Sequence, residues 1–280
     1  MSLPKVFVND TRQRIRNGHP WVFGSQVLRV EGDPAPGGIV QVIDVKKGPL
    51  GAGYYNEASQ IRVRLLSWNS EEAIDAALIR ARIRQAATLR SRTMPDASSA
   101  RIVFGESDGL PGLVVDKFND LIVFQTLALG MEQWKKAIVD ELVAVFEPRG
   151  IYERNDVPVR EKEGLAQLKG FAGEPFDTRT EVEENGLRFA VDVAIGQKTG
   201  HFLDQRWNHA AMRLVSKDAR VMDLFTHTGG FALHAIRYGA VHVEGVLNPG
   251  AAAADDPALD RAERNLGIDA LHVVGLAVDA

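Results

Sequence analysis

The sequence of 280 residues contains no cysteine. This absence excludes disulfides, zinc–thiolate sites and thiolate catalysis within the chain, although it says little about the redox compartment. No apolar run approaches the roughly 20 residues of a membrane-spanning helix, and residues 1–10 lack the apolar core of a secretory signal. Internal repeats are also absent. We therefore expect an ordinary globular protein of the cytoplasm that has no membrane partner.

The net charge of −4 is unevenly distributed along the chain. Residues 1–95 contain 14 Lys and Arg against 8 Asp and Glu, which gives +6. The remaining 185 residues contain 19 against 29, which gives −10. A positively charged N-terminal part is expected of a segment that binds a polyanion. Solvated surface charge explains the same asymmetry equally well.

Residues 1–68 contain short strand patterns separated by turn signals. The runs KVFVN, WVFGSQVLRV, GIVQVIDV, GAGYYN and QIRVRLLSW are apolar or alternating, and GDPAPGG and KKGPLG lie between them. Ile61, Val63 and Leu65 alternate with Arg62 and Arg64, as in a half-buried strand. The sequence predicts a small all-β barrel or sandwich over 1–68.

Residues 69–186 predict a central α+β domain. Asn69 followed by Glu72 resembles a capping box, so we expect a helix from there to about residue 92. A turn at Asn119 and Asp120 separates two strands, and residues 131–146 have a helical pattern that Pro148 stops. The pair Asn185 and Gly186 is a strong hairpin signal.

Residues 187–280 change to an alternation of helices and buried strands. Helices are expected over 206–215 and 230–238, and strands over 220–225 and 241–246. Such alternation implies a parallel sheet with right-handed crossovers. The overall fold class is therefore a multidomain α/β and β protein with boundaries at 1–68, 69–186 and 187–280.

The run DLFTHTGGFALHA, residues 223–235, places a glycine loop between a strand and a helix. In a parallel sheet this position is where ligands bind, because a helix N-terminus follows the strand. Gly229 and Gly230 leave room for a ligand, and Asp223 can accept a hydrogen bond from an amine or hydroxyl. The pattern suits an adenosine-bearing cofactor. It does not match G-x-G-x-x-G, which disfavours a dinucleotide.

Together with GQKTGHFLDQR, residues 196–206, this run resembles the S-adenosylmethionine-dependent methyltransferases of large-subunit ribosomal RNA. Members of that family carry an N-terminal PUA domain and modify cytosine at the ring 5-position. FGESDGLPGLVVDKF (104–118) and YERNDVPVR (152–160) resemble the family's central domain. GHPWVF (18–23) and GAGYYNEASQIRVRLLS (51–67) resemble its PUA domain. The match runs in order along almost the whole chain and implies a PUA-like β-barrel, a central α+β domain and a Rossmann-like domain.

The resemblance implies roles for individual residues. Those expected to border the cofactor's methionine end are Lys198, Thr199, Gly200 and Arg206. Those expected in the loop beneath it are Asp223, Phe225, Thr228, Gly229 and Gly230. Alternatives stay open, since Arg206 could pair with Asp204 and Phe225 could be a core residue; His227 is not expected to be a catalytic base. The PUA-like domain would place Arg12, Arg14 and Arg16 on ribosomal RNA phosphates, with a solvated face as the alternative.

The chain departs from the family pattern after residue 246. Leu247 occupies the position at which the family carries an acidic residue that binds the ribose hydroxyls of the cofactor. Asp256 or Asp255 could supply this carboxylate, with Asn248 as a weaker substitute, and Asp279 corresponds to the adenine-side acid. The D-P-P-type motif and the catalytic cysteines are missing, so we expect the Rossmann-like methyltransferase domain to be partial. No catalytic residue and no metal ligands are assigned.

Three functions compete at this stage. The first is S-adenosylmethionine-dependent methylation of ribosomal RNA, with the chain by itself inactive on cytosine, because attack on the base needs a thiolate. The second is a non-catalytic RNA-binding protein, and the third is an oxidoreductase that uses a dinucleotide. The oligomeric state stays open, with a homodimer as one candidate.

Overall fold

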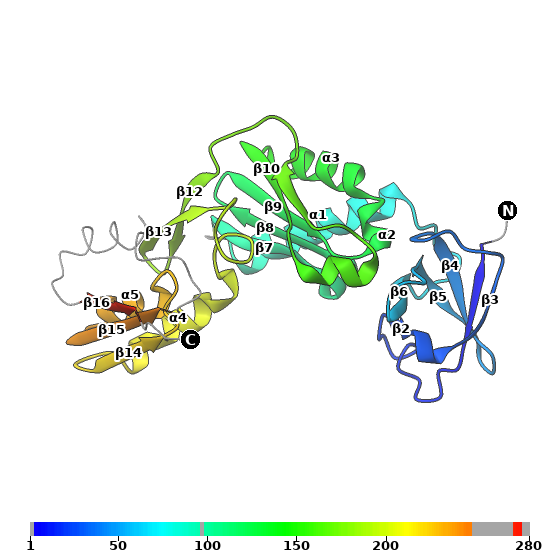
Figure 1. Cartoon of the computed structure of the whole chain (residues 1–280), viewed down its shortest axis with the longest axis horizontal. Helices are drawn as coiled ribbons and strands as arrows, with labels where there is room; N and C mark the ends of the chain where they lie inside the picture. Colours follow the sequence, from blue (N-terminus) through cyan, green and yellow to red (C-terminus); the bar gives the residue numbers. More distant parts are fainter. Residues whose placement is uncertain (1–2, 96–97, 248–270, 276–280) are drawn as a thin grey trace. The chain divides into compact units, whose positions relative to one another are not determined.

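The computed structural model describes residues 3–95, 98–247 and 271–275 (Figure 1). This described chain divides into two compact units. The first unit holds the described residues up to 178 except 98 and 99, and the second holds 98, 99 and the described residues from 179 onward. Within the described residues, the helices are too short or too polar for a membrane crossing.

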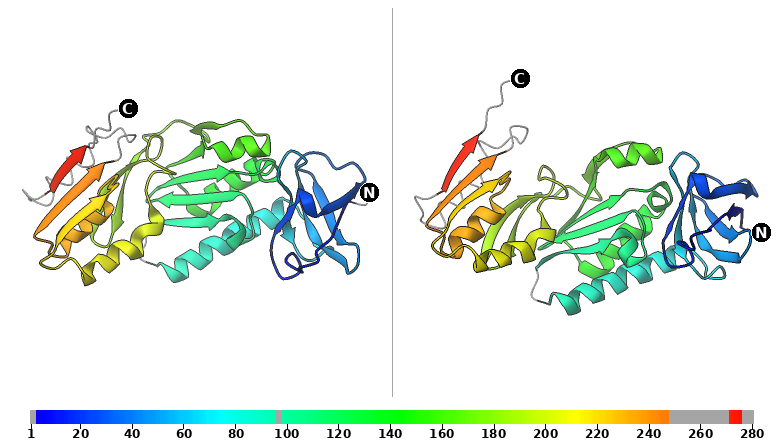
Figure 2. Two further views of the ribbon diagram at one scale, coloured as in Figure 1. Left: turned by 60° about the horizontal axis from the view of Figure 1, so that its bottom comes forward. Right: turned by 90° about the horizontal axis from the view of Figure 1, so that it is seen from below.

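The N-terminal part of the first unit is a curled six-stranded sheet in the order β2-β6-β5-β4-β1-β3 (Figure 2). Strand β1 runs parallel to β4 and antiparallel to β3. Alternate residues of β4, such as Val40 and Val42, are buried in the core, whereas Gln41 between them is partly exposed. The expected small all-β domain is confirmed. Its strands are β1 Lys5–Val8, β2 Trp21–Phe23, β3 Val27–Glu31, β4 Ile39–Asp44, β5 Gly48–Tyr55 and β6 Ile61–Ser67.

The central part of the chain is a five-stranded sheet in the order β11-β10-β9-β8-β7, with helices packed against it. Asn119 and Asp120 form the turn between antiparallel β8 and β9, as expected. The strands are β7 Ser99–Phe104, β8 Leu113–Phe118, β9 Leu121–Thr126, β10 Gly150–Asn155 and β11 Leu168–Phe171. The helices are α1 Ala76–Thr93, α2 Leu129–Glu132 and α3 Lys135–Phe146.

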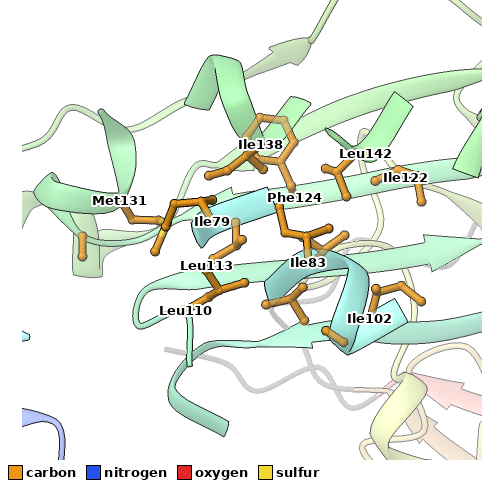
Figure 3. Packing of buried hydrophobic residues seen from close by; sticks show 14 of the residues in the cluster. Ile79, Ile83, Ile102, Leu110, Leu113, Ile122, Phe124, Met131, Ile138 and Leu142 are labelled. Carbon is orange, nitrogen blue, oxygen red and sulfur yellow. The ribbon is translucent and has the colours of Figure 1, made fainter. Parts of the chain in front are cut away.

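A single large apolar core joins these helices to the sheet (Figure 3). Ile79 and Ile83, four residues apart on α1, belong to this core together with Ile138 and Leu142 of α3. Phe124 of β9 lies between the two pairs in Figure 3. The spacing of four places each helical pair on one face, which explains why both helices bury a stripe. The mixed α/β architecture expected for the centre is confirmed.

Two local expectations for the central helices are wrong. Helix α1 begins at Ala76, where the Oδ1 atom of Asp75 accepts a hydrogen bond from Leu78 N at 3.0 Å. Asn69 instead caps a turn, since its Oδ1 atom accepts from Glu71 N at 3.0 Å. The helix expected over 131–146 is broken into α2 and α3 at residues 133 and 134. Its C-terminus is as expected, because Glu147 is left-handed at φ 43° and Pro148 follows.

The second unit begins with a hairpin and continues into a parallel sheet. Asn185 and Gly186 form the turn between antiparallel β12 and β13, as expected. Strands β14, β15 and β16 form a parallel three-stranded sheet in that order (Figure 2). The elements are β12 Arg179–Glu184, β13 Leu187–Asp192, α4 Arg206–Ala211, β14 Arg220–Leu224, α5 Gly230–Arg237, β15 His242–Leu247 and β16 Leu271–Gly275.

Helix α5 connects the apolar contacts of this unit. Leu233 packs with Leu187 and Phe189 of the hairpin, while Ala232 and Ala235 pack with Val243 of β15. The strand, glycine loop and helix expected from the sequence are present, and the Rossmann-like alternation is confirmed over the described residues. Short 3-10 helices lie at Gly24–Gln26, Gly105–Asp108, Pro158–Glu163, Leu203–Gln205 and Met212–Leu214.

Candidate binding sites

The loop between β14 and α5 is tightly wound and is held by Asp223. Phe225, His227 and Gly229 all have left-handed backbone, at φ 64°, 49° and 77°. The Oδ2 atom of Asp223 accepts hydrogen bonds from Thr226 Oγ1 at 2.7 Å and from Ala232 N at 3.1 Å. Ala232 is the third residue of α5, so this carboxylate caps the helix from the preceding strand.

A pocket of about 420 Å³ opens beside this loop. Gly230 forms part of its wall, and a Cβ atom at this position would lie 2.7 Å from the ring of His209. The wall is mainly aromatic and uncharged polar, and none of its residues is a lysine, an arginine or a carboxylate. The lining residues are Gln197, His201, Phe202, Gln205, His209, Phe225, Thr226, His227, Thr228, Gly230 and Phe231.

The loop residues expected around a cofactor lie at or beside this pocket. Phe225, Thr228 and Gly230 line it. Phe225 is 72% exposed and is therefore not a core residue. Gly229 is the N-cap of α5. Asp223 lies beneath the loop, with Oδ2 already engaged by Thr226 and Ala232.

The residues expected at the methionine end border the pocket without lining it. Lys198 Nζ lies 3.4 Å from both carboxylate oxygens of Asp204 and 4.2 Å from the centroid of the Phe202 ring. Thr199 and Gly200 are buried in the same turn. Arg206 Nη2 donates to the carbonyl oxygens of Ser99 at 3.2 Å and Glu183 at 3.4 Å, so these two bonds go to backbone and not to Asp204.

Several pocket residues were not anticipated. Gln197, His201, Gln205 and His209 recur at intervals of four residues and all line the pocket. They come from the turn before α4, the 3-10 helix Leu203–Gln205 and α4, so their spacing is not a helical period. The signal that could have identified Gln197, His201 and Gln205 is their place in the run GQKTGHFLDQR. The expected cofactor residues Asp256 and Asp279, with Asp255 and Asn248, lie outside the described residues.

Behind the pocket, four buried titratable side chains converge; we call Glu184, His201, His209 and His234 the Glu184 cluster. Glu184 Oε1 lies 2.5 Å from His209 Nδ1 and 3.9 Å from His234 Nε2. Glu184 Oε2 lies 3.7 Å from His201 Nε2. Burial opposes ionisation of Glu184, but the imidazoles of His201 and His209 outweigh it and lower the pKa to about 2.

The pKa of the third histidine, His234, is shifted downward. Burial lowers the pKa of His234, and the charge of His209 acts in the same direction, against the hydrogen bond to the Gly230 carbonyl. The rings of His209 and His234 are stacked, with centroids 4.9 Å apart. Glu184, His209 and His234 offer ligand atoms that all lie within 4.8 Å of one another, which makes them a candidate metal-ligand set.

A second hollow, of about 400 Å³, lies on the N-terminal sheet. Arg12 and Arg14 line it and are exposed. Arg16 is exposed as well, but its Nη2 atom donates to the carbonyl oxygen of Lys47 at 3.1 Å outside the hollow. The other lining residues are Asn9, Asp10, Thr11, Phe23, Ser25, Gln26 and Leu28.

A buried carboxylate organises the chain around this hollow. Asp44 Oδ2 accepts from Asp10 N at 2.8 Å, and Oδ1 accepts from Lys46 N at 2.9 Å and Lys47 N at 2.8 Å. Burial would raise the pKa of Asp44, but these backbone hydrogen bonds outweigh it and lower the pKa. The loop that presents the arginines is thereby tied to β4.

Comparisons with known proteins give two family matches along the chain. Residues 9–68 match a family described as a PUA-like domain. Residues 161–267 match a family described as an S-adenosylmethionine-dependent methyltransferase. A Streptococcus mutans structure described as a SAM-dependent methyltransferase has the same fold, with a TM-score of 0.80 and 18% identity over 99% of this chain and 71% of that chain.

Curated relatives are similar over nearly the whole chain. Ribosomal RNA large subunit methyltransferase I of Pseudoalteromonas translucida is 39% identical, over 93% of this chain and 65% of its own length. The protein of the same name from Klebsiella pneumoniae is 38% identical, over 96% of this chain and 67% of its own length. The chain therefore spans about two thirds of the length of these relatives.

Proposed function

Because the chain belongs to the family of ribosomal RNA large subunit methyltransferase I, we propose that its second unit binds S-adenosylmethionine and its N-terminal sheet binds ribosomal RNA. The inherited reaction is methyl transfer to cytosine at the ring 5-position. The observation that carries the cofactor proposal is the pocket of about 420 Å³ beside the loop between β14 and α5.

The chemistry of the pocket wall fits this cofactor better than a dinucleotide. Phe202, Phe225 and Phe231 offer aromatic faces, which attract a ligand cation such as a sulfonium. The start of α5 at Gly230 favours a carboxylate, because helix N-termini are electropositive. No lysine or arginine among the described lining residues is placed to meet a pyrophosphate. When bound, S-adenosylmethionine supplies the methyl group.

The remaining assigned residues act around this pocket in the proposal. Lys198, Thr199, Gly200 and Arg206 fix the turn that forms the wall opposite the loop. Asp223 and Gly229 fix the loop and the start of α5. Asp256 and Asp279 remain predictions for the ribose and adenine contacts.

Calorimetry with S-adenosylmethionine, its demethylated product and NAD tests the cofactor proposal. We expect the two sulfur-containing ligands to bind more tightly than NAD. Gly229→Val should abolish this binding, because valine is strained at φ 77°. Glu181→Ala, at an exposed position of β12, is the matched control and should bind as the parent does. Equal or tighter binding of NAD would refute the proposal.

The proposal for RNA rests on the exposed arginines beside the N-terminal hollow. Phosphate neutralisation makes such binding fall steeply with salt. Replacing Arg12, Arg14 and Arg16 together with Ala should weaken binding to all RNA sequences alike and flatten the salt dependence. If the triple variant binds as the parent does, these arginines form only a solvated face.

The absence of cysteine favours a second candidate, an RNA-binding protein that does not itself methylate cytosine. Attack on the pyrimidine ring needs a strong nucleophile near neutral pH, which a thiolate provides. We expect the 280-residue polypeptide to bind cofactor and RNA without forming 5-methylcytosine. Incubation with tritiated S-adenosylmethionine and unmodified ribosomal RNA, followed by nucleoside analysis, tests this. Stoichiometric 5-methylcytosine would show that another group serves as the nucleophile.

A further inference from the structure

The Glu184 cluster brings together side chains from four separate segments of the second unit. Glu184 ends β12, His201 lies in the turn before α4, His209 lies on α4, and His234 lies on α5. All four are at least 97% buried, with exposed fractions of 1%, 3%, 3% and 0%. Buried ionisable groups are expected to be paired or to coordinate metals.

Two atoms of this cluster are not satisfied by hydrogen bonds. Neither Glu184 Oε2 nor His201 Nε2 has a hydrogen-bond partner among the described residues. They face each other at 3.7 Å, which is too long for a hydrogen bond. Two ligands of one tetrahedral zinc ion, each about 2.1 Å from the metal, lie about 3.4 Å apart. The separation of these two atoms is therefore close to that of two ligands of one ion.

The central histidine is oriented as a metal-bound histidine is. His234 Nδ1 donates to the Gly230 carbonyl at 2.7 Å, which makes Nε2 the nitrogen that can accept; Nε2 lies 3.9 Å from Glu184 Oε1. Asn185 Nδ2 also approaches Nε2, at 3.2 Å. This amide donates to the Arg206 carbonyl as well, at 3.0 Å, and so keeps a partner when the imidazole binds a metal.

We propose that Glu184, His209 and His234, with His201 as the fourth ligand, form a binding site for a zinc-class divalent cation. Imidazole nitrogen and carboxylate oxygen are ligands that Zn²⁺ prefers. Glu184 Oε1 and His209 Nδ1, which lie 2.5 Å apart as a hydrogen-bonded pair, would separate to about 3.4 Å when both bind the ion. Binding of the metal displaces the proton of that bond to solvent, so no other reactant is needed.

The site would link four segments of the second unit, which supply one ligand each. One ion here would tie the hairpin, the pocket turn, α4 and α5 together. This role does not depend on binding of cofactor or RNA.

Metal analysis of the full 280-residue chain tests the site directly. After treatment with a chelator, equilibration with Zn²⁺ and desalting, we expect about one Zn²⁺ per chain by mass spectrometry. Glu184→Gln keeps the shape of the side chain but removes the charge, and should weaken zinc binding by at least about tenfold. His242→Gln, at a histidine of β15 outside the cluster, is the matched control and should retain the parent's zinc.

Two further measurements keep the inference testable if Glu184→Gln does not fold. Co²⁺ bound to the parent should give the ligand-field absorption of a tetrahedral nitrogen and oxygen site. Imidazole ¹⁵N resonances should move at His209 Nδ1 and His234 Nε2 on addition of Zn²⁺. A parent chain that retains no zinc, or a Glu184→Gln variant that binds zinc as tightly as the parent, overturns the proposal and leaves a hydrogen-bonded cluster.

Discussion

Replacement of Asp223 with Ala should release both the pocket loop and the first turn of α5. The carboxylate is 9% exposed, and its Oδ2 atom accepts from Thr226 Oγ1 and Ala232 N. Gly229, the N-cap residue of α5, has no side chain to satisfy the helix amides. Asp223 therefore provides the cap, and Ala at this position leaves the Thr226 hydroxyl and the Ala232 amide without this acceptor.

The size of the effect follows from these two bonds. A hydrogen bond to a charged group contributes about 1.5–3 kcal/mol, and a carboxylate at a helix N-terminus contributes about 0.3–1 kcal/mol. The contributions do not add in full, because both bonds share one oxygen. We expect the free energy of unfolding of the second unit to fall by about 2–3 kcal/mol. If the same free energy is lost from binding at the loop, S-adenosylmethionine affinity falls by roughly 30- to 140-fold.

Hydrogen exchange and calorimetry measure the two consequences separately. The amides of α5, Ala232 and Leu233 above all, should lose protection in the Asp223→Ala variant. Glu181→Ala is the control, since this exposed side chain approaches Arg188 only to 4.0 Å. Unchanged protection of α5 together with unchanged cofactor affinity would show that Asp223 neither caps the helix nor holds the loop.

Two further predictions concern the first unit. Asp44→Asn should lower its free energy of unfolding by about 1–2 kcal/mol near pH 7, because the amide NH2 group that replaces one carboxylate oxygen cannot accept a backbone hydrogen bond and the remaining oxygen is neutral. The pKa of Asp44 in the folded protein lies below its ordinary value of 3.8, so the contribution is complete above pH 3.8 and is lost as the pH falls through the folded pKa. Urea titrations of parent and variant should converge below that pKa. Gly130→Ala would place a Cβ atom 2.0 Å from Tyr54 Cγ and should lower the free energy of unfolding of this unit by about 1–3 kcal/mol, measured by urea titration. Gly170→Ala is the control and should change stability little, because no atom lies within 4 Å of its added Cβ. Equal urea midpoints for the two variants would contradict the packing argument.

Local chemistry made much of the fold predictable. The turn at Asn119 and Asp120 and the hairpin at Asn185 and Gly186 were correct, because these residues tolerate the backbone that a tight turn requires. The helix start predicted at Asn69 was wrong, because Asp75, six residues later, caps α1 instead. Both residues are good N-caps, and the sequence alone does not show which of them begins the helix. Arg64 is a further case, since an arginine alternating with core residues suggests an exposed face. It is buried instead, with Nη2 2.8 Å from Glu163 Oε1, a partner 99 residues away.

The binding sites were predictable only where their residues are consecutive. Phe225, Thr228 and Gly230 belong to one continuous sequence motif, and all three line the pocket. The Glu184 cluster draws on four segments that are spread over 51 positions, from 184 to 234, and no ligand spacing marks it. In the sequence, each of these histidines by itself gives no sign of a metal site. Only the packing of the hairpin and the helices brings these rings around one carboxylate.

The pocket and the Glu184 cluster share one wall, and this limits which substitutions can separate their roles. His201 and His209 belong to both, so a change at either alters the cofactor wall and the ligand set together. Glu184 and His234 do not line the pocket. Loss of zinc in Glu184→Gln with retained S-adenosylmethionine affinity would mean that the metal braces the unit without shaping the pocket. Joint loss would mean that the ring of His209 must be held from behind by the ion for the wall beside Gly230 to keep its form.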